Sequence, residues 1–205
     1  MITKTAKADY PIHELIAKRL SARAFSTRPV EKSKLVSILE AAGLAPSSRN
    51  EQPWRYIIFR NDNPEKIKNV QSVLKDINNY AKRAPILICA ISLKTYNVNK
   101  SNNRLHFHDL GASSENMFLE ALNHGLIMHE MAGFDLQKAR VAFNIHEEFE
   151  IGIMIALGYQ NTFCHHFNAC LRASTRYVMR FGYCLMNRLY TVSYTHLTLP
   201  TICSV

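Results

Sequence analysis

Long apolar runs are missing from this 205-residue sequence, and no stretch is hydrophobic enough to span a bilayer. Because the first residues also lack the apolar core of a secretory signal, we expect a cytoplasmic protein without a membrane partner. Cysteine is scarce before residue 160, where Cys89 stands alone inside an apolar run and is interpreted as a buried structural thiol. Hydrophobic residues make up 47% of the chain, which fits a globular domain with its own core.

Carboxylates are absent after Gln160, whereas four arginines and four of the five cysteines lie there. This last part shows neither helical nor strand periodicity. Residues 192–205 resemble the translated read-through of a transposase-based sequencing-library adapter, and residues 161–191 resemble a frameshifted join. We therefore interpret residues 1–160 as a C-terminally truncated domain and residues 161–205 as an artefactual tail. A divergent natural tail is the alternative, and an in-frame genomic copy of residues 192–205 would establish it.

The net charge of +9 raises the possibility of a nucleic-acid partner. Four of the positive charges lie after Gln160, and the basic residues before it are scattered among carboxylates. No basic face interleaved with aromatics is apparent, so we expect no nucleic-acid binding. The tail also contains Cys164, two histidines after it and Cys170, but the spacing matches no zinc pattern, so we expect no metal site.

Residue periodicity before Gln160 predicts helices that alternate with short strands. The expected helices are 11–20, 30–43, 64–74, 107–123 and one beginning after Asp135; the expected strands are 54–59, 86–93, 126–129 and 149–157. The strand over 86–93 is apolar on both faces and is therefore expected to be central. The result is an α+β domain with helices flanking a small sheet.

The connection between the second helix and the first strand is the most informative segment, Ala45 to Arg55. It combines two prolines with small hydroxyls and amides, a composition typical of a loop shaped around a polar ligand. The alternative is a capped helix end followed by an edge strand.

A second motif places Arg19 and Arg23 four residues apart with Ser21 between them. Two guanidinium groups in this arrangement can converge on an anion such as phosphate. From this motif alone, a helix end whose arginines pair with surface carboxylates is the more common arrangement.

Together the two motifs resemble the FMN-dependent nitroreductase family, which has Arg-x-Ser-x-Arg/Lys followed by Phe and Pro-Val, then Ala-Pro-Ser-Ser-x-Asn-x-Gln-Pro-Trp. Weaker matches surround Asn78, 108–112, 125–135 and 158–159, so that the resemblance covers about residues 10–160. It implies a cofactor site made of Arg19, Leu20, Ser21, Arg23, Pro46, Ser47, Ser48, Asn50, Gln52, Asn78, Met131, Ala132 and Gly133.

The resemblance implies a nitroreductase-like fold with a mostly antiparallel central sheet, and a homodimer with FMN at its interface. It implies hydride transfer from NADH or NADPH through FMN to nitroaromatics, quinones or similar electron-poor acceptors. Arg19 and Arg23 would bind the phosphate, and the Ala132–Gly133 backbone would border the reactive N5, with no catalytic side chain. Some members carry Glu where this chain has Ala132. Their further basic segment is replaced here by residues 161–205.

Two alternatives remain beside this reading. One is a specialised relative that fragments flavin or removes halogen, with slow and unselective nitroreduction. The other is a non-catalytic flavin- or nucleotide-binding module, which would not turn over reduced nicotinamide. His124 and His129 are interpreted as packing or hydrogen-bonding residues rather than ligands.

Overall fold

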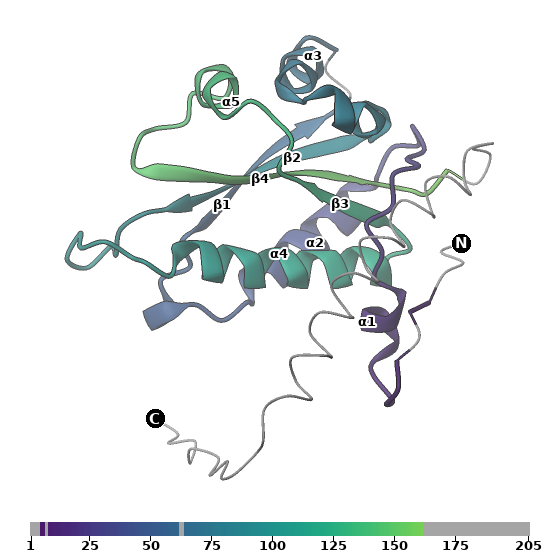
Figure 1. Ribbon diagram of the computed structural model, residues 1–205, viewed down its shortest axis with the longest axis horizontal. Helices are drawn as coiled ribbons and strands as arrows, with labels where there is room; N and C mark the ends of the chain where they lie inside the picture. Colours follow the sequence, from purple (N-terminus) through teal and green to yellow (C-terminus); the bar gives the residue numbers. More distant parts are fainter. Residues whose placement is uncertain (1–4, 7, 62–63, 162–205) are drawn as a thin grey trace.

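A four-stranded antiparallel sheet with helices on both faces forms the domain (Figure 1). The computed structural model describes residues 5–6, 8–61 and 64–161. The strands follow the spatial order β1-β2-β4-β3. Their bounds are β1 (Trp54–Arg60), β2 (Ile86–Leu93), β3 (Ile127–Met131) and β4 (Phe149–Gly158). The α+β class and the antiparallel sheet expected from the sequence are thereby confirmed.

β2 is central, as its uninterrupted apolar sequence predicted, and all eight of its residues are buried. It pairs with β1 from Ile86 to Ser92 on one side and with β4 along its whole length on the other. β4 is longer than β3, its other neighbour. β3 therefore pairs only with the half of β4 from Met154 to Gly158. A β-bulge interrupts the β2–β4 register, where Ala90 pairs with Ile153 and Ile91 with Ile151, so that Gly152 has no partner.

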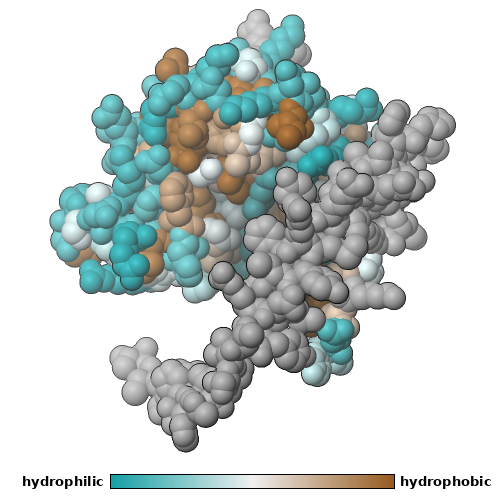
Figure 2. Space-filling view, viewed as in Figure 1, coloured by the Kyte–Doolittle hydropathy of each residue, from teal (hydrophilic) through white to brown (hydrophobic). Residues whose placement is uncertain are grey.

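Two helices cover each face of the sheet. The long α4 (His106–Asn123) and α2 (Lys32–Gly43) lie on one face, and α3 (Pro64–Val73) and α5 (Leu136–Ala142) lie on the other (Figure 1). Alternate residues of β2 therefore enter two separate hydrophobic clusters, with Leu87 and Cys89 in one and Ile86 and Ile88 in the other. Cys89 is buried and free, as expected. In the same view, hydrophobic side chains gather between α4 and α5 (Figure 2).

The N-terminal helix is shorter than its apolar spacing predicted. α1 (Glu14–Lys18) begins three residues after Pro11 because the His13 side chain accepts a hydrogen bond from the Leu15 N–H and caps it there. The chain leaves the helix in extended conformation at Arg19. Leu20 was expected on the helix but lies beyond its end, where its side chain is buried.

Two short 3-10 helices complete the fold. The first, η1 (Ser48–Asn50), lies in the loop singled out above. The second, η2 (Asp76–Arg83), was not predicted as an element, and Asn78 breaks its regular geometry with φ −107° and ψ 16°. Asp135 caps α5 as expected, by accepting a hydrogen bond from the Lys138 N–H. In the part of the chain that the structure describes, no helix is long and apolar enough to cross a membrane. The tail interpreted from residue 161 onward lies, apart from Asn161, outside the described residues.

Candidate functional site

The extended segment after α1 carries the first arginine of the predicted anion site. The Arg19 guanidinium carbon lies 5.2 Å from the centre of the Phe118 ring on α4, a cation–π contact. Its Nη1 also donates to Ser21 Oγ at 3.4 Å. Arg19 therefore lies over the C-terminal half of α4, with Ser21 beside it.

Arg23 connects this segment to η2 and to the loop after β3. Its guanidinium carbon lies 5.3 Å from the centre of the Tyr80 ring. The Tyr80 hydroxyl donates to Asn78 Oδ1 at 3.0 Å, and Asn78 Nδ2 donates to the Gly133 carbonyl at 2.8 Å. Three of the predicted cofactor residues, Arg23, Asn78 and Gly133, are thus joined through Tyr80.

Two features of this group bear on what it can bind. Arg23 Nε is buried and has no hydrogen-bond partner among the described residues. A buried guanidinium N–H without a partner is costly, and an anionic group supplies both the missing acceptor and the opposite charge. Gly133 meets a packing requirement, since a Cβ there would lie 2.7 Å from Asn78 Nδ2 and displace that amide. The residues present therefore fit a phosphorylated cofactor.

His129 on β3 fixes the extended segment to the sheet. Its Nδ1–H donates to the Ala22 carbonyl at 3.0 Å, and its ring meets Tyr80 edge-on with centroids 5.0 Å apart. Burial lowers its pKa below the ordinary value of 6.5; the hydrogen bond to Ala22 opposes this shift and Arg23 adds to it. This agrees with the packing and hydrogen-bonding role expected for His129.

We expect His129 to make the domain less stable in mild acid. Because its folded pKa is depressed, the unfolded chain binds the extra proton as the pH falls through 6.5. The unfolding free energy should then decrease until the folded pKa is reached. Urea titrations at about pH 8 and about pH 5.5 should show a smaller decrease in His129→Gln than in the wild type. The exposed His146→Gln is the matched control, and equal decreases in all three proteins would contradict the assignment.

The second predicted half of the site is the loop from Pro46 to Gln52. The Ser48 N–H donates to Asp109 Oδ2 at 3.0 Å, and Ser48 Oγ lies 3.1 Å from the Tyr96 hydroxyl. The Gln52 N–H donates to Ser47 Oγ at 3.0 Å. The hydrogen bond to Asp109 holds the loop against the first turn of α4, and the Gln52–Ser47 bond closes the loop on itself.

The loop has an unusual backbone. Arg49, Asn50 and Gln52 all have positive φ, at 56°, 54° and 49°. Asn tolerates this region well, whereas Arg and Gln adopt it at a steric cost. Such strain persists where surrounding contacts enforce it, and it concentrates at ligand-binding loops.

One chain does not bring the two halves together. Arg19 contacts α4 at Phe118, whereas the loop contacts α4 at Asp109. Nine residues of α-helix correspond to roughly 13 Å along the axis. One half of the predicted site consists of Arg19, Leu20, Ser21, Arg23, Asn78, Met131, Ala132 and Gly133. The other half consists of Pro46, Ser47, Ser48, Asn50 and Gln52.

Sequence reasoning missed two residues that organise these halves. Tyr80 occupies a position where the family pattern has Trp, and a ring at that position was the available signal. Asp109 is 2% exposed and holds Ser48 in place. Its signal was an acidic residue on an otherwise apolar face of the predicted helix. Within the described ranges, no group of three or more His, Cys, Asp or Glu is arranged to hold a metal.

Comparison with known proteins gives several matches. The provisionally named NADH dehydrogenase/NAD(P)H nitroreductase of Archaeoglobus fulgidus is 27% identical over 71% of this chain and 83% of its own length. Rat iodotyrosine deiodinase 1 is 35% identical over 35% of this chain, and the alignment spans only 25% of the rat protein.

Solved structures share the fold. A crystal structure of an oxidoreductase containing FMN has a TM-score of 0.71 and 29% identity, over 76% of this chain and 80% of that one. An FMN-dependent nitroreductase of Clostridium difficile R20291 has a TM-score of 0.62 and 26% identity, over 73% and 88% of the two chains. The model of the Nitroreductase family matches residues 16–159, and the chain belongs to this family of oxidoreductases.

Proposed function

We propose that this protein is an FMN-dependent NAD(P)H oxidoreductase that reduces nitroaromatics, quinones or similar electron-poor acceptors. The observation that carries the proposal is the connected group of Arg23, Tyr80, Asn78 and Gly133, with its buried Arg23 Nε free of a partner among the described residues. Family membership and the FMN named in two similar structures support it.

The protein's part in the reaction is positioning and electrostatics. FMN, when bound, would supply the redox chemistry, which is the transfer of electrons from a reduced nicotinamide to the acceptor. Arg19 and Arg23 would bind the phosphate and stabilise negative charge that develops on reduction. Asn78 orients the Gly133 peptide by its hydrogen bond, which would keep that backbone in place beside the cofactor. No side chain of the chain is assigned a covalent step.

We further propose that the working form is a homodimer with the cofactor at the interface. The separation of roughly 13 Å between the two halves along α4 supports this, since the 46–52 loop of a second copy would complete a site begun by the 19–23 segment. We propose a cytoplasmic location and activity carried by residues 1–160, with residues 161–205 as the artefactual tail. Resequencing the source locus tests that division.

The test is a visible spectrum of the purified full chain, supplied with FMN and recorded before and after anaerobic addition of NADPH or NADH. We expect a flavin band that bleaches and that returns when a nitroaromatic or quinone is added. A bound flavin that neither nicotinamide reduces would instead support a non-catalytic flavin-binding module. Failure to retain any flavin would overturn the cofactor assignment for this chain.

The match with iodotyrosine deiodinase favours one second candidate, reductive removal of halogen. The same reduced protein, mixed with a halogenated phenol, would then release halide. Halide release faster than nitroaromatic reduction would favour this candidate over the first.

A further inference from the structure

The loop from Pro46 to Gln52 carries a basic side chain that has no role in the proposed phosphate site, Arg49. This residue lies between Ser48 and Asn50, both of which are predicted to bind the cofactor. Its φ of 56° is in the left-handed region, which arginine adopts only at a steric cost. Arg49 is exposed, so its guanidinium lies at the surface of the loop that is proposed to meet a second copy.

An aromatic ring holds the Arg49 guanidinium. Its central carbon lies 4.8 Å from the centre of the Tyr96 ring, a cation–π contact. The Tyr96 hydroxyl lies 3.1 Å from Ser48 Oγ, so the ring is itself tied to the loop. Contact with a ring occupies the face of a guanidinium and leaves the N–H groups at its edge to donate. The contact also restricts the side chain before a ligand arrives, which lowers the entropy that binding costs.

The carboxylates nearest to Arg49 in the sequence and at the loop are engaged elsewhere. Tyr96 belongs to a tight turn, residues 95–102, closed by an isolated bridge between its first and last residues. The Asn97 N–H of this turn donates to Glu51 Oε1. Asp109 accepts a backbone N–H of the loop. Within the described ranges Arg49 forms no ion pair, so its charge is available to a ligand.

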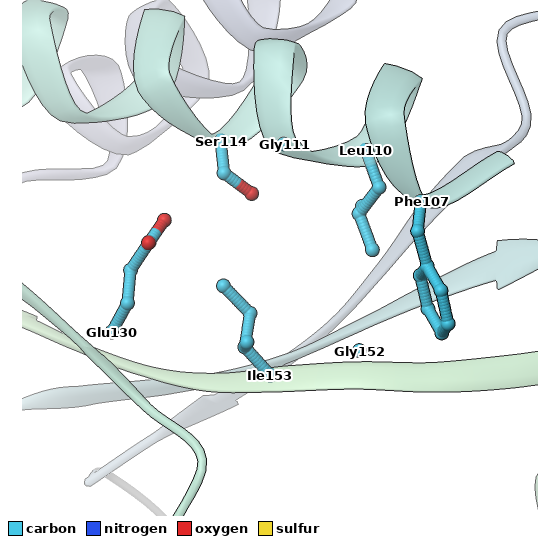
Figure 3. Close-up of a pocket in the computed structure, with 7 residues that line it drawn as sticks. All are labelled: Phe107, Leu110, Gly111, Ser114, Glu130, Gly152 and Ile153. Atoms are coloured by element: carbon cyan, nitrogen blue, oxygen red, sulfur yellow. The ribbon is translucent and has the colours of Figure 1, made fainter. Parts of the chain in front are cut away.

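The face of α4 between the two predicted halves of the site lacks a cation among the described residues that line its hollow of about 320 Å³ (Figure 3). Three apolar side chains line this hollow: Phe107, Leu110 and Ile153. Glu130 is the charged residue of the lining, and it repels an anionic group. With Arg19 and Arg23 assigned to the cofactor phosphate, Arg49 is a cation that remains for a charged group of the substrate.

We propose that Arg49 determines acceptor specificity and selects aromatic acceptors that carry a carboxylate or a similar oxyanion. This inference rests on the proposed function and on the proposed dimer, in which the loop of a second copy completes the site. The Arg49 N–H groups donate to the carboxylate in the bidentate arrangement that these two groups prefer. Tyr96 is a positioning residue, because its ring holds the guanidinium at the loop. The phosphates of the reduced nicotinamide offer the same chemistry, so the experiment varies the acceptor alone.

Steady-state kinetics of the flavin-loaded full chain with three nitroaromatic acceptors of one shape test the proposal, at a fixed concentration of reduced nicotinamide. The acceptors are para-nitrophenylpropionate, neutral para-nitrophenylpropanol and cationic para-nitrophenylpropylammonium. Their methylene spacers separate the charge from the nitro group, so its intrinsic ease of reduction stays the same. We expect kcat/KM for the anion to exceed that for the neutral acceptor about tenfold, with the ammonium lowest. Added salt should reduce this preference, because it screens exposed charges.

Substitutions assign the preference to named groups through the ratio of kcat/KM for the anion to that for the neutral acceptor. This ratio cancels changes in flavin content, since both acceptors meet the same enzyme. Arg49→Ala should bring the ratio to about one, Arg49→Lys should keep part of it, and Arg49→Glu should favour the ammonium. Tyr96→Phe should keep the ratio because the ring remains, whereas Tyr96→Leu should lower it about threefold.

Lys68→Ala is the matched control for loss of one positive charge. Lys68 is exposed on α3, which covers the face of the sheet opposite to α4 (Figure 1). Its ratio should equal that of the wild type.

The failure of this inference and the failure of the proposed function give different results. Reduction of all three acceptors at equal kcat/KM, or a preference that survives in Arg49→Ala, would overturn the role of Arg49 and leave the proposed function intact. A raised KM for NADPH relative to NADH in Arg49→Ala, with an unchanged acceptor ratio, would assign Arg49 to a nicotinamide phosphate instead. A wild-type protein that reduces none of the three would overturn the proposed function, and this inference with it.

Discussion

Replacement of Gly158 by valine is expected to lower the unfolding free energy by about 3 kcal/mol. Gly158 lies at the end of β4, paired with Ile127 of β3. A Cβ there would lie 2.5 Å from Pro85 Cδ and 2.8 Å from Pro85 Cγ, with Phe25 Cδ1 at 3.5 Å. The proline ring cannot rotate away, and Phe25 is fully buried. Relief therefore requires the end of the strand or the entry into β2 to move.

Urea unfolding followed by the fluorescence of Trp54, the one tryptophan of the chain and 7% exposed, measures this loss. Gly43→Val is the matched control, because a Cβ there meets nothing within 4 Å, and its change should stay within about 0.5 kcal/mol. Pro85→Ala should return part of the loss in the double variant, as a coupling in the double-mutant cycle. Full additivity of the two changes would contradict the proposed contact.

Removal of the Arg23 side chain is expected to weaken FMN binding by about 10- to 100-fold, since a hydrogen bond to a charged group contributes roughly 1.5–3 kcal/mol. Arg23 supplies a buried Nε that lacks a partner within the described part of the chain, beside Tyr80. Arg23→Ala removes both the guanidinium donor that would bind the FMN phosphate and its positive charge. Fluorescence quenching during titration of FMN into the protein measures the dissociation constant.

Lys138→Ala on α5 controls for loss of one positive charge, because Lys138 is exposed and is not among the predicted cofactor residues. Arg23→Lys keeps the charge without the planar fork and should fall between the alanine variant and the wild type. FMN affinity that is the same in Arg23→Ala as in Lys138→Ala would show that the phosphate is bound elsewhere.

Residue periodicity predicted the sheet well because the burial of apolar side chains determines where the strands lie. β2 is apolar at every position, and such a run has one stable place, the middle of a sheet covered on both faces. α1 was less predictable, since one side-chain hydrogen bond from Leu15 to His13 fixes its start more strongly than the apolar spacing before it. The family match was confirmed, but the placement of the individual cofactor residues stays a prediction.

The geometry of the site could not be predicted from the sequence, for physical reasons. Arg49 and Gln52 have positive φ in a loop whose Ser48 N–H is bound to Asp109 of α4, and neither residue type favours such φ values. Nothing in the spacing of Arg23 and Asn78 along the chain indicates that Tyr80 would join them. Nor does it indicate that the two predicted halves would contact α4 in different turns.

The strand order β1-β2-β4-β3 also has a consequence during translation. β4 is an inner strand, yet it is synthesised after all the others. The second edge of β2 and the edge of β3 cannot pair until β4 has been made. A nascent chain that stops before Phe149 leaves β2 with one open edge and β3 with no partner in the sheet. The domain should therefore gain its cooperative stability only after β4 has left the ribosome, and the exposed edge of β2 is the segment that a chaperone would need to protect until then.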